Sequence, residues 1–506
     1  MSPYREQVER VLPRLLALYD RNPISPTRGL GDRYRWAWKL IDFGNATFQG
    51  ACHGLARLVA AEALPAYLPR AAALGRIDEM VAAAVELRDS DGSVGEAFPH
   101  EASFCVTALV AHDILATAAL VDDPGRRARC LEAAAPMIRF LERNDETHAL
   151  ISNHLATALA ALVRWHSLGG GGGLSRAESL LRRILDAQDG EGWFREYAGA
   201  DPGYQTLTTH YLADAHRLRP ELGLHEPLRR SLAFLVHFAH PDGSFGGLYG
   251  SRNTRFIAPG GIEALAPEFP EAAQLAAFAR LAIAARTTVT LETMDEPNLV
   301  PLFNSYCWAL AEERLLPTTD PLPATGEPFR RVFPSAGLIV DRGKRHYTVV
   351  SLHKGGVCQH FGQAGPVVDA GVVARKNGSL YSTQAHSTGN EWRETADGVE
   401  VVAPLVEVPF ELPSPLQFAT LRIAAETVLR IEPVRRATKR LLVRRVITRR
   451  REAPVANRRT IGFGDAPSIA DAWVGDAKGF ERVSVTRQFS TLHMASQGYW
   501  QVGDDS

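Results

Sequence analysis

Apolar residues recur with helical spacing through roughly the first 310 residues, in runs that turns separate. Three of these turns resemble one another: DSDGSVGEAFPHEASF at 89–104, AQDGEGWFREYAGADPGYQ at 187–205 and HPDGSFGGLYGSRNTRF at 240–256. Each follows an apolar run, turns at Asp-Gly and leads into a second apolar run. The pattern predicts a series of helical hairpins.

The second runs begin about every 50 residues, from Gly50, Glu101, Asn153, Tyr204, Thr254 and Asn304. This interval suits an outer helix, a loop and an inner helix, at about 1.5 Å per helical residue. Six hairpins that close on themselves form an (α/α)6 toroid, which we prefer to an open solenoid because solenoid repeats are usually shorter. All inner helices of such a ring begin at the same end, so their first residues are expected to face one cleft.

Beyond a Pro- and Thr-rich stretch the apolar period changes to two. SAGLIVDRGKRHYTVVSLHKGG at 335–356 and GVEVVAPLVEVPFEL at 398–412 alternate in this way. We therefore predict an α+β multidomain protein, with a toroid at 1–318, a linker at 319–332 and an antiparallel β-sandwich at 333–506.

One stretch, at about 415–452, interrupts the strand pattern. It carries nine basic residues from Arg435 to Arg451, interleaved with Leu, Val and Ile. We expect either an amphipathic helix inserted in the sheet or a pair of basic strands. Such a segment either contacts anionic lipid as a peripheral element or forms a solvated face.

Charge and cysteine content narrow the functional classes. The 56 basic and 57 acidic residues give a net charge of -1, so no overall field attracts nucleic acid. The five scattered cysteines lack the close pairs of zinc ribbons and are expected to be reduced. We see no secretory signal and no run of roughly 20 apolar residues, and expect a cytoplasmic protein, at the inner face of the membrane if the basic stretch binds lipid.

Many residues near the predicted inner-helix starts are polar, and such residue types are uncommon in a packed core. They are His53, His100, Glu101, Asn153, His154, Tyr204, Gln205, Tyr249, Arg252 and Asn253. Tyr204 with a neighbouring histidine suits proton removal from carbon and proton return to a leaving oxygen. Asn153 and Arg252 suit hydrogen bonding to a carboxylate or an enolate.

Each assignment has a structural alternative. Asn153 follows Ser152 at a helix start, where either residue is a favoured N-cap. Tyr204 and His154 are also ordinary residues for a surface loop, and Arg252 for an ion pair. The convergence of the group on one cleft is what favours a catalytic interpretation.

Two of these segments resemble the heparinase II/III-like polysaccharide lyases. SNHLATALAALVRW at 152–165 is similar to their Asn-His helix start, and DGEGWFREYAGADPGYQTLTTHYL at 189–212 to the motif that follows. YGSRNT at 249–254 also looks like a loop of relatives from bacterial polysaccharide gene clusters. The resemblance implies a toroid followed by a β-sandwich, with Asn153 neutralising the substrate carboxylate and Tyr204 facing the scissile bond.

The family's sandwich usually supplies a histidine and often binds a metal. HKGGVCQHFGQAGPVVDAG at 353–371 offers His353, His360 and Asp369 at the matching place. We expect one histidine to reach the cleft, with His360 as the catalytic candidate and His353 as a substrate contact. We expect no cofactor, with zinc or calcium in the sandwich as the alternative.

These observations predict a lyase that cleaves a uronic-acid-containing polysaccharide by β-elimination, with an anionic polysaccharide or oligosaccharide as its partner. The catalytic candidates are Tyr204, His154, Asn153, Arg252, Tyr249 and His360; the substrate-binding candidates are Glu101, His100, Gln205, Asn253, His53 and His353. A C5-epimerase of the same fold is the first alternative, and a cytoplasmic location favours it. A terpene-cyclase-like helical ring and a non-catalytic glycan-binding protein are further alternatives.

Overall fold

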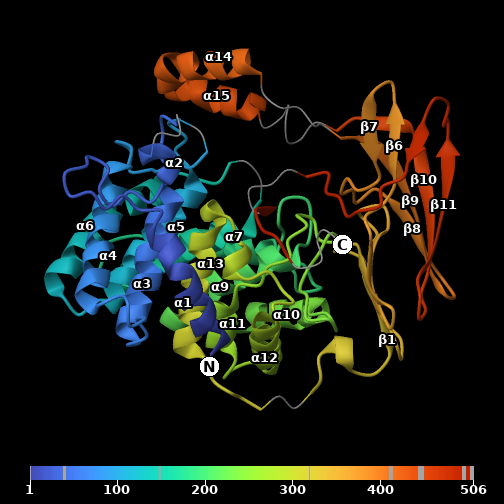
Figure 1. Cartoon of the computed structure of the whole chain (residues 1–506), viewed down its shortest axis with the longest axis horizontal. Helices are drawn as coiled ribbons and strands as arrows, with labels where there is room; N and C mark the ends of the chain where they lie inside the picture. The colour runs from blue at the N-terminus through green and yellow to red at the C-terminus, as the bar shows by residue number, and fades with distance from the viewer. Residues whose placement is uncertain are drawn as a thin grey trace.

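The computed structural model describes residues 2–37, 41–97, 99–147, 150–317, 320–408, 414–442, 450–492 and 497–501. Helices occupy the chain up to Glu312, and strands begin at Phe329 (Figure 1). Two further helices lie between the ninth and tenth strands. This order matches the predicted change of period from helical to alternating.

Twelve helices form six pairs, each an inner helix with the outer helix that packs on it. The outer helices are α1 (Pro3–Leu16), α4 (Arg70–Glu86), α6 (Pro124–Arg143), α8 (Leu174–Asp186), α10 (His225–Leu235) and α12 (Pro270–Ala285). The inner helices are α3 (Ala51–Ala60), α5 (Phe104–Leu120), α7 (Ser152–Ser167), α9 (Pro202–Leu218), α11 (Pro259–Leu265) and α13 (Glu296–Glu312). Five of the pairs are consecutive hairpins, from α3–α4 to α11–α12, and the sixth joins α13 to α1. A short helix, α2 (Arg33–Trp36), precedes α3.

Each inner helix packs against the next one, and α13 packs against α3. The ring is therefore closed, which confirms the (α/α)6 toroid and excludes the open solenoid. Asn304 joins the two ends of the ring, because its Nδ2 donates to Gly50 O and its Oδ1 accepts from Gly54 N, both at 3.0 Å.

The 50-residue interval predicts the starts of the first four inner helices to within a few residues, but not the starts of α11 and α13. Asn153 and Tyr204 lie in the first turns of α7 and α9. The prediction that a helix starts at Asn304 is wrong, since α13 begins eight residues earlier at Glu296 and is capped by Asp295, which accepts from Asn298 N at 3.2 Å. The prediction that a helix starts at Thr254 is also wrong, because this residue belongs to a loop that continues up to α11.

The strands form two antiparallel sheets. The first contains, in spatial order, β1 (Phe329–Phe333), β2 (Leu338–Arg342), β3 (Tyr347–Ser351), β4 (Val357–Gly362) and β5 (Gly365–Asp369). The second has the order β11-β10-β9-β7-β6-β12, and β8 pairs with β9; these strands are β6 (Val373–Lys376), β7 (Ser379–Ser382), β8 (Glu391–Thr395), β9 (Gly398–Glu407), β10 (Glu452–Gly462), β11 (Ser468–Gly475) and β12 (Glu481–Val483).

The first sheet is buried on both faces. Ile339 and Val350 pack against Val401 of the second sheet, whereas Val340 and Val349 join the core of the toroid. Neighbouring residues point to opposite faces of a strand, so this division follows from the period of two. The packing confirms the β-sandwich and fixes the first sheet against the toroid.

The basic stretch contains two helices, α14 (Pro415–Glu426) and α15 (Glu432–Leu442), while residues 443–449 lie outside the described residues. The helical alternative is therefore correct for 415–442. In Figure 1 this pair of helices projects from the body of the protein beside α2.

Two other segments differ from the predicted boundaries. The predicted linker includes most of β1, which begins at Phe329. The C-terminal segment 497–501 returns to the toroid, where Asp295 N donates to Gly498 O at 2.8 Å and Trp500 N to Thr293 O at 3.1 Å. Within the described residues, every helix is too short or too polar to cross a membrane.

Replacement of Asn304 by alanine tests the closure of the ring. The change leaves buried Gly50 O and Gly54 N without this partner and creates a small cavity, which should lower the free energy of unfolding by about 2–4 kcal/mol. Denaturant titration measures the loss. Gln274→Ala, which removes a solvent-exposed amide on α12, should cost under about 1 kcal/mol. Equal effects of the two changes would contradict this role for Asn304.

Candidate active site

Glu196 fixes the start of α7. Its carboxylate is fully buried and accepts from Asn153 N at 2.9 Å, Asn153 Nδ2 at 2.7 Å and Thr208 Oγ1 at 3.1 Å. Burial raises the pKa of Glu196 to about 8, against the effect of these hydrogen bonds. The residue in the N-cap position is Ile151, so the capping alternative for Asn153 is wrong. An amide group has two hydrogens, and the second one on Asn153 remains for another acceptor.

His154 is oriented by a carboxylate. Its Nδ1 lies 2.8 Å from Oε2 of Glu146, which is buried in the segment between α6 and α7. A carboxylate accepts hydrogen bonds, so Nδ1 carries the proton and Nε2 keeps its lone pair in the neutral ring. This arrangement prepares Nε2 of His154 to accept a proton.

Tyr197 stands between His154 and Arg252. Its ring centroid is 6.5 Å from that of His154 and 3.8 Å from Cζ of Arg252, which stacks on the ring. Burial raises the pKa of Tyr197, and the positive charge of Arg252 opposes this rise. The backbone of Tyr197 has a φ of +55°, a left-handed conformation that is uncommon for a residue other than glycine. His154 and Tyr197 are the partly exposed members of this group and can meet a ligand.

Asp201 positions Arg252. The fully buried Asp201 carboxylate caps α9 at Tyr204 N and accepts from Arg252 N at 2.8 Å and Thr254 N at 3.4 Å. The Thr254 hydroxyl donates to the same carboxylate. A side chain at Gly250 would lie 2.6 Å from Asp201 Oδ2, which explains the glycine there. The loop 249–254 is thus tied to the N-terminus of α9.

The β-sandwich supports the same loop through Lys354. The buried ammonium of Lys354 donates to Gly250 O at 2.9 Å, and also to Leu248 O and Asn253 Oδ1. Burial lowers the pKa of Lys354 to about 7. Asn253 in turn donates from Nδ2 to Ser490 Oγ at 2.7 Å.

The histidine that the sandwich brings to this region is His386. A Cβ at Gly199 would lie 2.5 Å from its Nε2, which places the ring against the turn that carries Tyr197. His353 packs edge to face on His386, with centroids 5.3 Å apart. Burial lowers the pKa of His386 to about 3, so the ring is neutral at physiological pH.

His360 lies apart from this group, contrary to expectation. It bonds through Nδ1 to Thr348 Oγ1 at 2.8 Å, and it shares with Cys358 the face of β4 that points to the second sheet. Gln359, the next position, approaches Gly247 of the toroid instead. The period of two therefore excludes His360 from the cleft.

Several other candidates have structural roles. Tyr249 is 1% exposed and bonds through its hydroxyl to His240 Nε2 at 2.9 Å, so it belongs to the core. Gln205 is fully buried and donates to Ser231 Oγ at 2.9 Å. Glu101 accepts from two backbone amides of its own loop, Glu96 N and Ala97 N, and His100 lies half-buried in that loop.

Tyr204 is half-buried in the first turn of α9. Its ring packs edge to face on Phe256, with centroids 6.0 Å apart. Phe256 in turn contacts Tyr499 of the C-terminal segment. The structure thus directs Tyr204 toward the C-terminal segment and Tyr197 toward His154 and Arg252.

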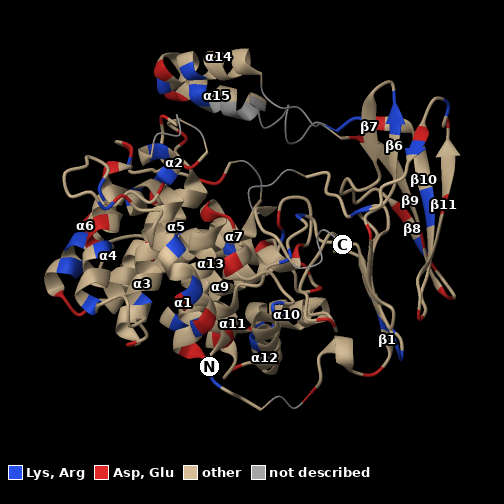
Figure 2. Ribbon diagram, viewed as in Figure 1, with Lys and Arg blue, Asp and Glu red and all other residues tan. Residues whose placement is uncertain are grey.

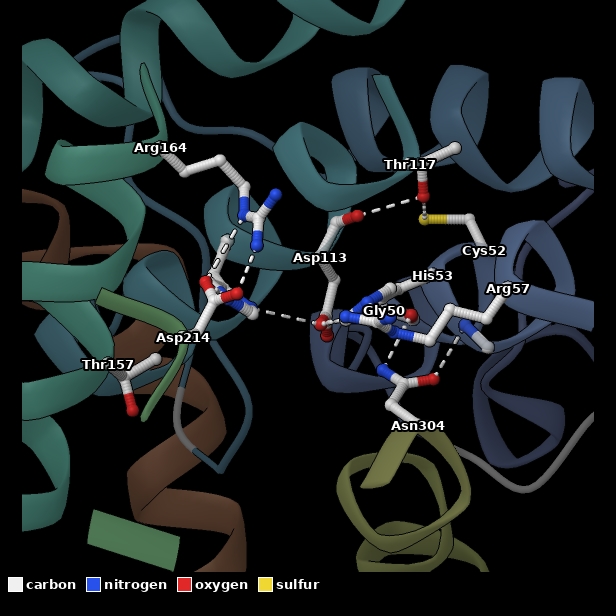
Figure 3. A network of polar contacts seen from close by, with 12 residues as sticks. Gly50, Cys52, His53, Arg57, Asp113, Thr117, Thr157, Arg164, Asp214 and Asn304 are labelled. Carbon is white, nitrogen blue, oxygen red and sulfur yellow. Dashed lines mark hydrogen bonds and ion pairs between the residues drawn. The ribbon is translucent and has the colours of Figure 1, made fainter. Parts of the chain in front are cut away.

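His53 belongs to a buried network of polar side chains that includes residues of the inner helices α3, α5 and α9 (Figure 3). Nε of Arg57 donates to His53 Nε2 at 2.8 Å, so Nδ1 of His53 carries the ring proton and donates to Asp113 at 2.9 Å. His112 lies between Asp113 and Asp214, at 3.4 and 3.0 Å. These polar side chains are buried between the inner helices. His53 is 1% exposed and is therefore too deep to contact a substrate.

Two groups of residues contain side chains of the types that bind metal ions. Among the described residues, the group with the spacing of metal ligands is His53, His112 and Asp113. The bond from Arg57 requires a lone pair on His53 Nε2 and hence a proton on Nδ1, so this group does not fit a cation. The predicted set in the sandwich, His353, His360 and Asp369, does not form such a group among the described residues, and Asp369 pairs with Arg459 at 2.6 Å.

A cavity of about 220 Å³ lies beside the loop that carries Arg252. The C-terminal segment forms its opposite wall. The lining residues are Leu248, Asn253, Arg255, Gln488, Phe489, Ser490, Gln497 and Tyr499.

Comparison with solved structures finds proteins of related architecture. Heparinase III is 10% identical, with a TM-score of 0.47 over 96% of this chain and 80% of that one. The chondroitin AC lyase of Streptomyces coelicolor A3, solved in complex with chondroitin sulphate, is 11% identical, with a TM-score of 0.47 over 80% of this chain and 67% of that one. The cellobiose 2-epimerase of Bacillus thermoamylovorans B4167 is 11% identical, with a TM-score of 0.44 over 61% and 98%.

No protein-family model matches the chain, and no curated protein matches its sequence. The similarity to these solved structures concerns the arrangement of helices and strands.

Replacement of Glu196 by glutamine tests its raised pKa. An unfolded glutamate ionises near pH 4, whereas folded Glu196 ionises near about 8, so its contribution to stability is complete below about pH 4 and is lost as pH rises through about 8. The melting temperature of Glu196→Gln should therefore fall less between about pH 5 and 8 than that of the wild type. Parallel pH profiles of the two proteins would show that Glu196 is already ionised in the fold.

Proposed function

We propose that the protein is a polysaccharide lyase that cleaves a uronic-acid-containing polysaccharide by β-elimination. The observation that carries the proposal is the group formed by the Glu146–His154 pair, Tyr197, Asn153 and Arg252. It combines a carboxylate-oriented base, a protonated acid and two donors suited to a carboxylate. These are the groups needed to remove a proton from the carbon beside a carboxylate.

His154 takes the role of base in this proposal. Its Nε2 removes the proton from C5 of the uronate, and Glu146 stabilises the imidazolium that forms. Arg252 and Asn153 bind the uronate carboxylate, which lets negative charge build up on it as the C5–H bond breaks. The planar guanidinium of Arg252 suits the two oxygens of a carboxylate.

Tyr197 takes the role of acid. Its raised pKa keeps the phenol protonated, so the hydroxyl can donate to the oxygen that leaves C4. The C5–H and C4–O bonds break, a C4–C5 double bond forms, and the proton on His154 later returns to Tyr197 through solvent. The guanidinium stacked on the ring stabilises the phenolate in the interval.

A C5-epimerase remains the alternative, because it needs the same base and the same carboxylate contacts. It differs in returning a proton to the opposite face of C5 without loss of the oxygen at C4. Deuterium from solvent would then enter C5 while no unsaturated product forms.

The tyrosine that acts as the acid can be identified with two matched variants. Tyr197→Phe and His154→Gln should each lower kcat on a uronate polymer by about 100-fold or more, the usual contribution of a general acid or base. Tyr204→Phe should lower it less than about tenfold, because that ring faces Phe256. The ultraviolet absorbance of the conjugated uronate product measures the rate. A large loss in Tyr204→Phe with an active Tyr197→Phe would instead return the acid or base role to Tyr204.

A further inference from the structure

The helical insertion, residues 414–442, exposes an unusual number of large apolar side chains. Leu416 and Ile423 on α14 are 76% and 67% exposed, and Leu441 on α15 is 64% exposed. The other exposed ones are Phe418, Val428, Ile431 and Val434. Helical residues seven positions apart share a face, so Leu416 with Ile423, and Val434 with Leu441, form a stripe on each helix. A soluble helix normally turns such a stripe toward a core.

The same region concentrates positive charge. Residues 414–442 hold six basic and two acidic side chains, a net charge of +4, whereas the whole chain carries -1. In Figure 2 both basic and acidic residues are visible on α14 and on the described part of α15. Apolar stripes next to basic residues are typical of helices that lie in a membrane interface.

The helical insertion projects from the body of the protein. It projects beside α2 and away from both sheets (Figure 1). Arg422 pairs with Asp42 of the toroid at 3.7 Å, and both side chains are exposed, so this pair adds little to the attachment. Within the helical insertion, Ala425 and Leu429 are the only buried residues among those whose exposure is described. The apolar stripes are therefore accessible to a partner.

We propose that the helical insertion docks this protein onto an anionic lipid surface. Leu416, Ile423 and Leu441 enter the boundary between head groups and acyl chains, while the basic residues pair with lipid phosphates. A second copy of the chain is a poor occupant because two insertions that each carry a net charge of +4 repel each other. A soluble acidic polysaccharide matches the charge but has no acyl phase into which Leu and Ile can insert.

Co-sedimentation of the full chain with vesicles tests the proposal. Vesicles that combine phosphatidylcholine and phosphatidylglycerol should bind the protein, and vesicles of phosphatidylcholine alone should bind it at least tenfold more weakly. An increase from about 0.1 M to about 0.5 M salt should weaken binding to the anionic vesicles by tenfold or more, because it shortens the screening length. Equal binding to both kinds of vesicle, or no binding to either, overturns the proposal.

The triple variant Leu416→Ser/Ile423→Ser/Leu441→Ser tests the apolar stripes. It should bind anionic vesicles at least tenfold more weakly and keep the wild-type melting temperature, since all three positions are exposed. Leu281→Ser is the matched control, because Leu281 on α12 is 73% exposed outside the insertion, and its vesicle binding should not change. Unchanged binding of the triple variant overturns the proposal. So does a wild-type chain that self-associates through the insertion, or that binds an acidic polysaccharide through it while ignoring vesicles.

Discussion

The candidate site depends on the buried carboxylate of Asp201. It caps α9 and, at the same time, binds the backbone of the loop that carries Arg252. From the other side, Lys354 of the β-sandwich binds the carbonyls of the same loop. Asp201 is fully buried and Lys354 is 1% exposed. Loss of either side chain would leave buried polar groups of the loop without their hydrogen-bond partners, which is costly.

This arrangement explains why the two domains form one site. The start of α7 contributes Asn153 and His154, the turn before α9 contributes Tyr197, and the loop before α11 contributes Arg252. The first sheet is buried between the toroid and the second sheet, so the segment that carries Lys354 is held firmly against that loop. The geometry at Tyr197 and Arg252 therefore rests on contacts from segments far apart in the sequence.

Much of the fold could be predicted from the sequence because it is periodic. A 50-residue interval indicated the toroid, and a period of two indicated the sandwich. Asn153, His154 and Arg252 were predicted from their place near the expected inner-helix starts, and the structure places His154 and Arg252 on either side of Tyr197. The same rule wrongly included Tyr249 and Gln205, since proximity to a helix start does not tell whether a side chain points to the cleft or to the core.

The residues that sequence analysis missed lie where periodicity carries no signal. Glu146, Glu196 and Tyr197 are in loops, and the left-handed backbone of Tyr197 depends on a turn closed by tertiary contacts. The motif at 189–212 did contain Glu196 and Tyr197, which follow its Asp-Gly turn at 189–190 after five intervening residues. Lys354 and His386 come from the sandwich, and only the packing of the two domains brings them to the site.

The most direct test of the account is a crystal structure of the His154→Gln variant with a bound uronate oligosaccharide. We predict that one uronate carboxylate lies within hydrogen-bond distance of both Arg252 and Asn153, with the Tyr197 hydroxyl facing the glycosidic oxygen. An oligosaccharide bound elsewhere, for example in the cavity between Arg255 and Tyr499, with no carboxylate near Arg252, would contradict it.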